Sequence, residues 1–527
     1  MYPSSVFFII SPALFILPGD LQGNLLTVDT FCSRLESDDT DIPDEGTGLL
    51  KLQRANLVTQ IISVADSRKK QVLIRGAAGS GKTSLLAYVA RELKRRDLRV
   101  LIAANPTMLP SLETLLNQAW EGQQEGNPEK QSQRPLYLLI DEAQQSYAKG
   151  ILHALLKIHP NKRNIVIIAA GIPGKTGESA AFSNRIEPER VLLSEDEVCQ
   201  DPVVQFFYEK LALTLGDEHV ESTARAATIE VLKFSHYYTA GHAYACLKIA
   251  EYCVTQQASK CISEQLREKL GLALGSKAFL EAVGNTIFHR CFPFFSNHAA
   301  VDVLRNDYVK GGNTLVRQLQ EHGLWDSINN RLLSPLLQYH LFCLMPKADD
   351  FVFTNSSQIG DALYHCTRDY KRWKFTQYEA GTDAVRDRCE DGISFFLGCE
   401  LSKYCLVSPQ HAISRSQATP GRPPSVDYYL NGRLDMYLEV VKNGSLLEEH
   451  FDRFITGDYG VKKPFAVLDI NFKTEKPRDL KGKYAEYNKN FFTYVVHTRQ
   501  LFRGMELFKY KGETSVSAPS KPVGTAS

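Results

Sequence analysis

The chain has 527 residues, and its 61 Lys and Arg against 60 Asp and Glu leave a formal net charge of +1. This balance excludes attraction of nucleic acids or membranes by the field of the whole chain and leaves that role to local patches. The eleven cysteines are an odd number without a Cys-x-x-Cys pair, which argues against a disulfide framework or a zinc site and favours a reducing compartment.

The N-terminal segment begins with an apolar run at residues 6–17 that contains Pro12. The run is too short to span a membrane, and no other stretch predicts a span. Two interpretations remain open: the apolar region of a secretory signal peptide, although no Lys or Arg precedes it, or a buried strand of a small module. Residues 34–48 are acidic and rich in turn residues, so residues 1–48 are interpreted as an N-terminal segment and linker.

Residues 76–83 read Gly-Ala-Ala-Gly-Ser-Gly-Lys-Thr and lie between the apolar run 71–74 and a helical pattern. This is the pattern and the setting of a phosphate-binding loop, in which glycines let backbone N–H groups turn toward a phosphate at a helix N-terminus. Lys82 is predicted to reach the β- and γ-phosphates, and the Thr83 hydroxyl to ligate Mg²⁺. The predicted ATP-binding positions are Gly76, Gly79, Ser80, Gly81, Lys82, Thr83, Ser84 and Asp141.

Around this loop, runs rich in β-forming residues occur at 71–75, 99–104, 136–141, 165–170 and 190–193. The first four are separated by helical or loop stretches, among them a polar loop at 122–134. Such alternation predicts an α/β fold, a P-loop NTPase with a parallel sheet and helices on both faces. We assign this ATPase core to residues 49–200.

The apolar run 136–140 ends in Asp141 and Glu142. Asp141 is predicted to hold Mg²⁺ through water, and Glu142 to act as the base or orienter for the attacking water. With one more strand between this run and the loop, the pair indicates the P-loop branch with a catalytic glutamate, alongside AAA-type and STAND-type ATPases. Ala169 and Ala170 stand where a polar sensor residue is usual, which argues against efficient turnover.

After residue 200 the β signal fades, and residues 201–348 are predicted to form a helical lid with a further helical segment. Within it, residues 302–333 fit a winged helix or an ordinary helical bundle equally well. Residues 349–512 are mixed again: a helix-like stretch at 386–405, strands at 426–430, 434–441, 465–470 and 491–497, and a helix at 445–454. Asn431-Gly432 is a hairpin signal, and the tail 513–527 is predicted to be disordered.

Four residues of this C-terminal part have the chemistry of a metal-dependent nuclease. Glu400 lies in the first helix, Asp427 in the first strand, and Glu439 and Lys442 in the second. Carboxylates such as Asp427 and Glu439 bind Mg²⁺, and a lysine stabilises the charged transition state. The order is similar to the restriction-endonuclease-like arrangement, but its usual Glu-x-Lys is here Glu-x-x-Lys. From the residues alone, solvated surface charges are the favoured interpretation.

These motifs together resemble the Crinkler effector family of oomycetes and fungi over about residues 65–500. The similarity covers the P-loop, Leu139-Ile140-Asp141-Glu142, Thr239-Ala240-Gly241-His242, and the segments 399–404, 421–430, 438–444 and 449–454. In that family such an ATPase is joined to a restriction-endonuclease-like domain that acts on host DNA in the nucleus.

The resemblance therefore implies ATP and Mg²⁺ as cofactors, double-stranded DNA as a partner and a secreted protein acting in a host nucleus. It also raises Glu400, Asp427 and Glu439 to a metal site. The family's N-terminal header is not found in residues 1–64, and Asn471 stands where an arginine is expected. The alternative is a STAND-like nucleotide-driven switch whose C-terminal domain is catalytically silent and binds a partner. Self-association stays open.

Overall fold

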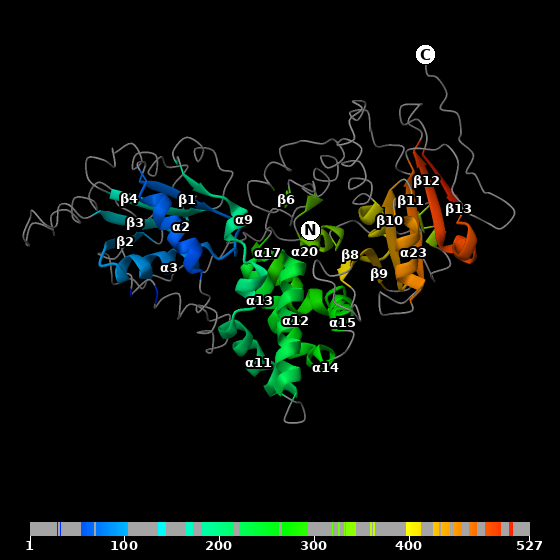
Figure 1. Ribbon diagram of the computed structural model, residues 1–527, viewed down its shortest axis with the longest axis horizontal. Helices are drawn as coiled ribbons and strands as arrows, with labels where there is room; N and C mark the ends of the chain where they lie inside the picture. Colours follow the sequence, from blue (N-terminus) through cyan, green and yellow to red (C-terminus); the bar gives the residue numbers. More distant parts are fainter. Residues whose placement is uncertain are drawn as a thin grey trace, which may run out of the picture. The chain divides into compact units, whose positions relative to one another are not determined.

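The computed structural model divides into two compact units, Met1–Phe206 and Phe207–Ser527. Figure 1 labels their helices and strands. The described residues are 29, 32, 54–67, 70–103, 135–143, 165–171, 182, 184–215, 221–262, 266–291, 319, 325–326, 331–332, 334–343, 359–360, 362–363, 397–412, 425–431, 434–442, 444, 446–455, 463–471, 480–496 and 505–509. The predictions for the linker 34–48, the loop 122–134 and the tail 513–527 lie outside them, as do those for the apolar run 6–17 and for most of 302–333.

The first unit is built on a five-stranded parallel sheet with the order β2-β3-β4-β1-β5. Its strands are β1 (Gln71–Arg75), β2 (Arg99–Ala103), β3 (Leu136–Ile140), β4 (Ile165–Gly171) and β5 (Arg185–Ile186). β4 lies between β1 and β3, in register Leu73↔Ala169 and Ile140↔Ala169. The predicted parallel sheet is confirmed, and its carboxyl edge carries both the loop after β1 and the acids after β3.

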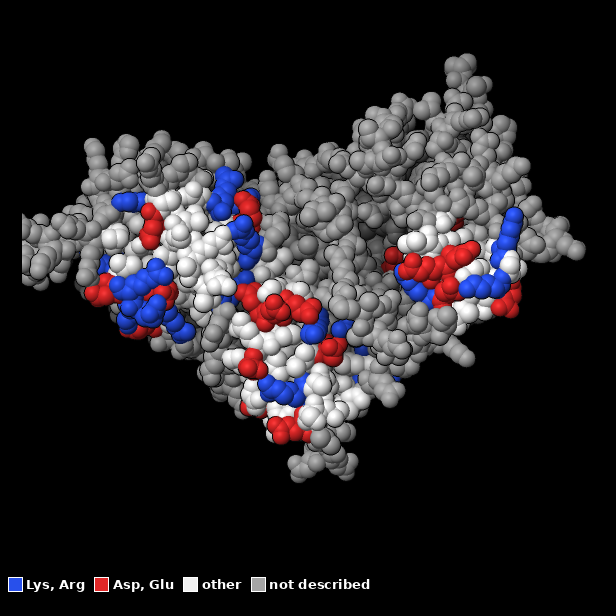
Figure 2. All heavy atoms as spheres, in the orientation of Figure 1, with Lys and Arg blue, Asp and Glu red and all other residues white. Residues whose placement is uncertain are grey.

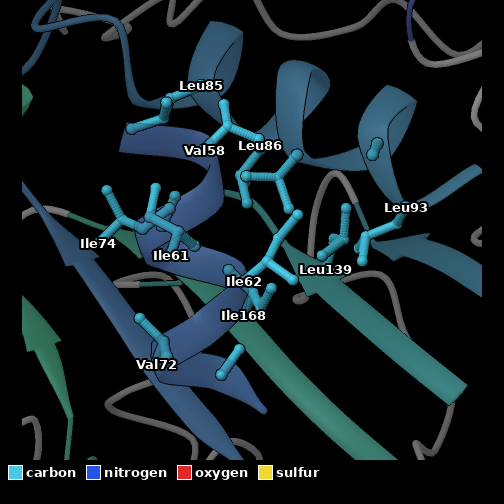
Figure 3. Packing of buried hydrophobic residues seen from close by; sticks show 14 of the residues in the cluster. Val58, Ile61, Ile62, Val72, Ile74, Leu85, Leu86, Leu93, Leu139 and Ile168 are labelled. Carbon is cyan, nitrogen blue, oxygen red and sulfur yellow. The ribbon is translucent and has the colours of Figure 1, made fainter. Parts of the chain in front are cut away.

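Two helices, α2 (Ala55–Ala65) and α3 (Lys82–Arg95), cover one face of this sheet. Their apolar sides pack on alternate residues of the strands, as Figure 3 shows for Ile61, Leu86, Ile74 and Ile168. Leu73 and the other alternate residues form a second buried cluster on the opposite face. Burial on both faces explains why these strands read as continuous apolar runs.

The strand predicted at 190–193 is wrong. The edge strand β5 lies earlier, at Arg185–Ile186, and residues Pro188–Val191 form a short helix, α9. Pro188 stands at the start of α9, where its fixed φ suits a helix and its missing N–H costs nothing. The helix α10 (Glu195–Val198) follows, with a capping box at Ser194.

The second unit begins with helices, as predicted, and none of the described helices is long and apolar enough to cross a membrane. A two-stranded antiparallel ribbon, β6 (Trp325–Asp326) with β7 (Arg331–Leu332), lies within the segment predicted as a winged helix or bundle. The helices are α11 (Asp201–Leu215), which crosses the unit boundary, α12 (Glu221–Thr239), α13 (Ala243–Gln256), α14 (Ala258–Cys261), α15 (Leu266–Leu274), α16 (Lys277–Phe279), η3 (Leu280–Gly284), α17 (Asn285–Cys291) and α20 (Pro335–Cys343).

A six-stranded mixed sheet completes this unit, in the order β13-β12-β11-β10-β9-β8. The predicted hairpin is confirmed, because β9 and β10 pair antiparallel with Met436 opposite Leu430. Its elements are β8 (Leu406–Ala412), β9 (Ser425–Asn431), β10 (Met436–Lys442), α23 (Leu447–Ile455), β11 (Phe465–Asn471), η7 (Gly482–Asn490), β12 (Phe491–Val496) and β13 (Met505–Lys509).

The sequence did not predict β8 or β13, the two edge strands of this sheet. Pro409 lies within β8 and weakens the β signal of this segment, yet it pairs with Tyr428 of β9. A proline is tolerated there because an edge strand has only one neighbour to bond. β13 pairs antiparallel with β12 and is likewise bonded on one side.

Candidate nucleotide-binding site

The loop between β1 and α3 has a backbone that only glycine adopts without strain. Gly79 has φ 73° and Gly81, the N-cap of α3, has φ 91°, both in the left-handed region that disfavours side chains. A Cβ at Gly76 would lie 2.6 Å from Ser80 Oγ. The chain thus turns tightly into the N-terminus of α3, where the first backbone N–H groups, including that of Ser84, have no intrahelical partner.

This loop fits a phosphate. The Ser80 Oγ atom is buried and has no hydrogen-bond partner within the described part of the chain, so a phosphate oxygen would satisfy a hydroxyl that is costly to leave alone. A side chain at position 76 would fill the cradle that glycine leaves. The loop amides and the dipole of α3 add positive potential at the same place.

Lys82 is buried at the base of the loop, and its Nζ donates to the carbonyl oxygen of Ala77 at 2.7 Å. Burial lowers the pKa of Lys82, while the nearby charges of Glu142 and Asp141 raise it. A triphosphate would therefore supply the compensating negative charge that this buried ammonium group favours.

Asp141 and Glu142 leave the end of β3 in a fixed turn. Backbone bonds hold it from both sides, from Asp141 N to the carbonyl of Ala103 and from Ala143 N to that of Ala170, each 2.9 Å long. Glu142 has φ 50°, a left-handed conformation that costs energy for a non-glycine residue and is frequent at functional sites.

The predicted magnesium ligands lie together. Burial and the charge of Glu142 raise the pKa of Asp141 to about 6, opposed by hydrogen bonds from Thr83 and from the Glu142 backbone. Hydroxyl and carboxylate oxygens suit Mg²⁺, so Thr83 and Asp141 are the residues that would hold the ion. The sequence predicted this convergence because both follow parallel strands and so reach the same edge of the sheet.

The raised pKa of Asp141 predicts that its charged form lowers the free energy of unfolding at neutral pH. Between pH 3.8 and about 6 the folded state binds the proton more tightly than the unfolded chain, so this group's contribution to the free energy of unfolding falls as pH rises. We expect Asp141→Asn without Mg²⁺ to raise the free energy of unfolding by up to about 3 kcal/mol at neutral pH, and little near ~pH 4. Thermal melts at both pH values, with the exposed Asp97→Asn as control, measure this. Equal melting temperatures at neutral pH would contradict it.

From residue chemistry alone, the C-terminal acids are expected to be solvated surface charges, and the structure differs from this expectation. Glu400 is 1 % exposed and pairs with Lys403, and Glu439 is 3 % exposed. The surface interpretation is therefore wrong for these two residues. Asp427 is half-buried, and its Oδ2 accepts from Val440 N at 2.7 Å, which ties β9 to β10.

Glu439 instead contacts a residue that the sequence did not assign to it. Its Oε1 lies 2.7 Å from His450 Nδ1 of α23, and its Oε2 is buried without a hydrogen-bond partner among the described residues. Asp469 of β11, also fully buried, accepts from Gly444 N at 2.7 Å. No pattern in the sequence joins Glu439 to His450, because the contact depends on how α23 crosses the sheet.

The predicted three-acid metal site does not form within the described part. No group of three or more His, Cys, Asp or Glu side chains there could hold a metal ion. The second position after Glu439, where Glu-x-Lys would place the lysine, is Val441, which is buried in an apolar cluster with Phe451. Lys442 ends β10, and its side chain lies outside the described part.

The parallel sheet, the glycine loop and the acids after β3 define the first unit as an α/β P-loop fold. No protein-family model and no curated protein matches the chain. Among solved structures, the chain is similar to PCH-2 of C. elegans, with 13% identity and TM-score 0.28 over 40% of this chain and 68% of that one.

Two further similar structures are Trip13 of Rhizobiales, with 15% identity and TM-score 0.25 over 46% of this chain and 90% of that one, and a Walker-type ATPase of Pyrococcus abyssi. The latter shows 13% identity and TM-score 0.31 over 55% of this chain and 95% of that one. With TM-scores this low, it is the parallel sheet and the glycine loop that define the fold.

Proposed function

We propose that this protein is a nucleotide-driven ATPase of the AAA or STAND type. The observation that carries the proposal is the convergence of Lys82, Thr83, Asp141 and Glu142 beside a glycine loop that fits a phosphate. The position of β4 between β1 and β3 supports the branch with a catalytic glutamate.

Each residue has a distinct role in this proposal. The loop amides and Lys82 Nζ bind and orient the β- and γ-phosphates. When bound, Mg²⁺ neutralises charge on the phosphate oxygens, and the Thr83 hydroxyl and Asp141 carboxylate are placed to hold it. Glu142 orients the attacking water and takes its proton.

The end of β4, where a polar sensor residue is usual, favours slow ATP hydrolysis. β4 ends in Ala169, Ala170 and Gly171, so it offers no side-chain hydrogen bond to the γ-phosphate or the water. Slow hydrolysis suits a switch that changes state with its nucleotide better than a motor. Titration of the purified chain with ATP and Mg²⁺ tests the proposal, and the absence of saturable binding would reject it.

A second candidate is a Mg²⁺-dependent nuclease in the C-terminal domain under control of the ATPase, acting on double-stranded DNA. The helix-Glu400, strand-Asp427, strand-Glu439 order along the chain favours it, as do the Crinkler resemblance and the unsatisfied Oε2 of Glu439. The described side chains do not form a three-acid cluster, so a Mg²⁺ ion there would have fewer protein ligands than the resemblance implies. Lys442 would stabilise the transition state.

The surface around α23 weighs against this candidate. Glu448 and Glu449 in the first turn of α23 are exposed, and acidic side chains gather over this helix in Figure 2. Arg453 pairs with Glu449 and Lys483 with Asp452, so the excess negative charge is confined to the first turn of α23, where it would repel a polyanion unless cations bridge it. The catalytically silent switch is therefore the preferred form of the proposal.

Plasmid cleavage separates the two forms. If the domain is a nuclease, the protein with Mg²⁺ and ATP cuts DNA, and Asp427→Ala and Glu439→Ala each reduce the rate by roughly 100-fold or more. The exposed Glu448→Gln serves as the matched control. Intact DNA at every ATP concentration would reject the nuclease and leave the switch.

A further inference from the structure

Arg54, the residue before α2, is buried and bonded through every part of its guanidinium group. Its Nε donates to Glu197 Oε1 at 2.8 Å, and its Nη1 to the carbonyl of Val191 at 2.9 Å. Its Nη2 donates to the carbonyls of Leu192 at 3.0 Å and Arg190 at 3.3 Å, and to Glu197 Oε2 at 3.3 Å. A planar fork matches such a set of acceptors, whereas a lysine does not.

The partners of Arg54 all lie in residues 187–199, which we call the connector because they make up nearly all of the segment between β5 and α11. Glu197 is itself fixed there: its Oε2 accepts from Ser194 N at 2.8 Å, and its backbone N donates to Ser194 Oγ at 3.2 Å. This capping box holds the carboxylate in place for Arg54. Arg54 therefore clamps a preformed part of the connector.

The clamp lies at the edge of the sheet that carries the phosphate-binding loop. In Figure 3, Val58 of α2 lies near Leu85 and the end of β1 that holds Ile74. Val58 N bonds to the carbonyl of Arg54 at 3.0 Å, so Arg54 is one turn further toward that edge. α2 runs from this edge of the sheet toward the opposite edge, and β1 then runs in the reverse direction and ends at the loop.

The connector begins at the same edge of the sheet, after the strand β5 that neighbours β1. β5 pairs with β1 in register Ile74↔Ile186, and the next residue, Glu187, bonds Arg75 Nη1 at 3.0 Å. Arg75 immediately precedes Gly76, the first residue of the loop. The connector thus begins beside the loop, and Arg54 holds the part that follows.

We propose that Arg54 is a positioning residue of the nucleotide site: it holds the connector as a fixed wall beside the phosphate-binding loop. This inference rests on the proposed ATPase function. A preordered wall spares ATP binding the entropy of ordering the connector. Without the clamp, ATP binding itself must order the connector and loses the corresponding entropy. Lys82, at the start of α3, and Asp141 and Glu142, after β3, are not bonded to Arg54 and keep their positions.

Steady-state ATP hydrolysis and hydrogen exchange of residues 187–199 test this role together. We expect Arg54→Ala to raise KM roughly tenfold, to leave kcat within about twofold, and to speed exchange in the connector. Glu197→Gln, which keeps an acceptor but loses the charge, shifts KM in the same direction by less. The matched control is Arg267→Ala, which removes the 2.7 Å pair with Glu230 in the second unit and leaves KM unchanged.

The outcomes are distinguishable. Saturable ATP binding by the wild type with an unchanged KM in Arg54→Ala would overturn the inference alone, as would a kcat that falls in step with kcat/KM. No ATP binding by the wild type would reject the ATPase function and the inference with it. If Arg54→Ala does not fold, Arg54→Lys and Glu197→Gln carry the test, because Arg54→Lys keeps the charge and loses the fork.

Discussion

Replacing Lys82 by alanine is expected to weaken ATP binding by about 30- to 150-fold. The variant loses a charged contact to the phosphates that is worth about 2–3 kcal/mol. Lys82 is buried and its Nζ donates to the carbonyl of Ala77, so thermal melts of the variant must accompany the titration to show that it is folded. Calorimetric titration with ATP and Mg²⁺ measures the loss.

A suitable control for this variant lies on the same helix. Lys94 is in the last turn of α3, and its Nζ pairs with Asp29 at 2.6 Å in an exposed ion pair. Exposed pairs contribute little, so Lys94→Ala should bind ATP as the wild type does. Equal affinity in Lys82→Ala and the wild type would refute the assignment of the loop.

Glu142→Gln should slow ATP hydrolysis by about 100-fold or more while ATP affinity stays near that of the wild type. An amide keeps the shape of the side chain but cannot take a proton from water, and general-base catalysis supplies rate factors of this size. Single-turnover hydrolysis and a binding titration on the same preparation separate the two effects.

The matched substitution for this second variant is Glu92→Gln. Glu92 lies on α3 and binds Arg95 and Arg96 at the surface, so its loss should leave hydrolysis unchanged. Wild-type turnover in Glu142→Gln would show that another group activates the water. Loss of ATP binding would instead show that Glu142 serves in binding.

The arrangement of the candidate nucleotide site could be predicted from the sequence because its residues follow parallel strands. Once β1 and β3 are recognised as buried runs, the chain after each must reach the same edge, and Lys82 and Asp141 meet without any knowledge of packing. The left-handed Glu142 and the clamp at Arg54 could not be predicted in this way. The clamp joins residue 54 to residue 197, and no local pattern encodes contacts at that separation.

The C-terminal site was less predictable for a related reason. Alternation along β10 places Glu439 on one face, but which side chain meets it depends on α23, whose crossing is set by packing of Phe451 and Phe454 against Phe465. The contact with His450 is a product of that packing. The strand β8 was missed because Pro409 suppresses the β signal where an edge position removes its penalty.

Pro409 also limits how the six-stranded sheet can grow. An edge strand exposes backbone N–H groups with which another extended chain can pair. A proline has no N–H to donate and so interrupts this row of donors. Helices α20 and α15 also pack against β8, whose Ser408 and Pro409 are buried. We therefore expect a second molecule to gain no continuous ladder at this edge, because helix cover and the missing donor act together.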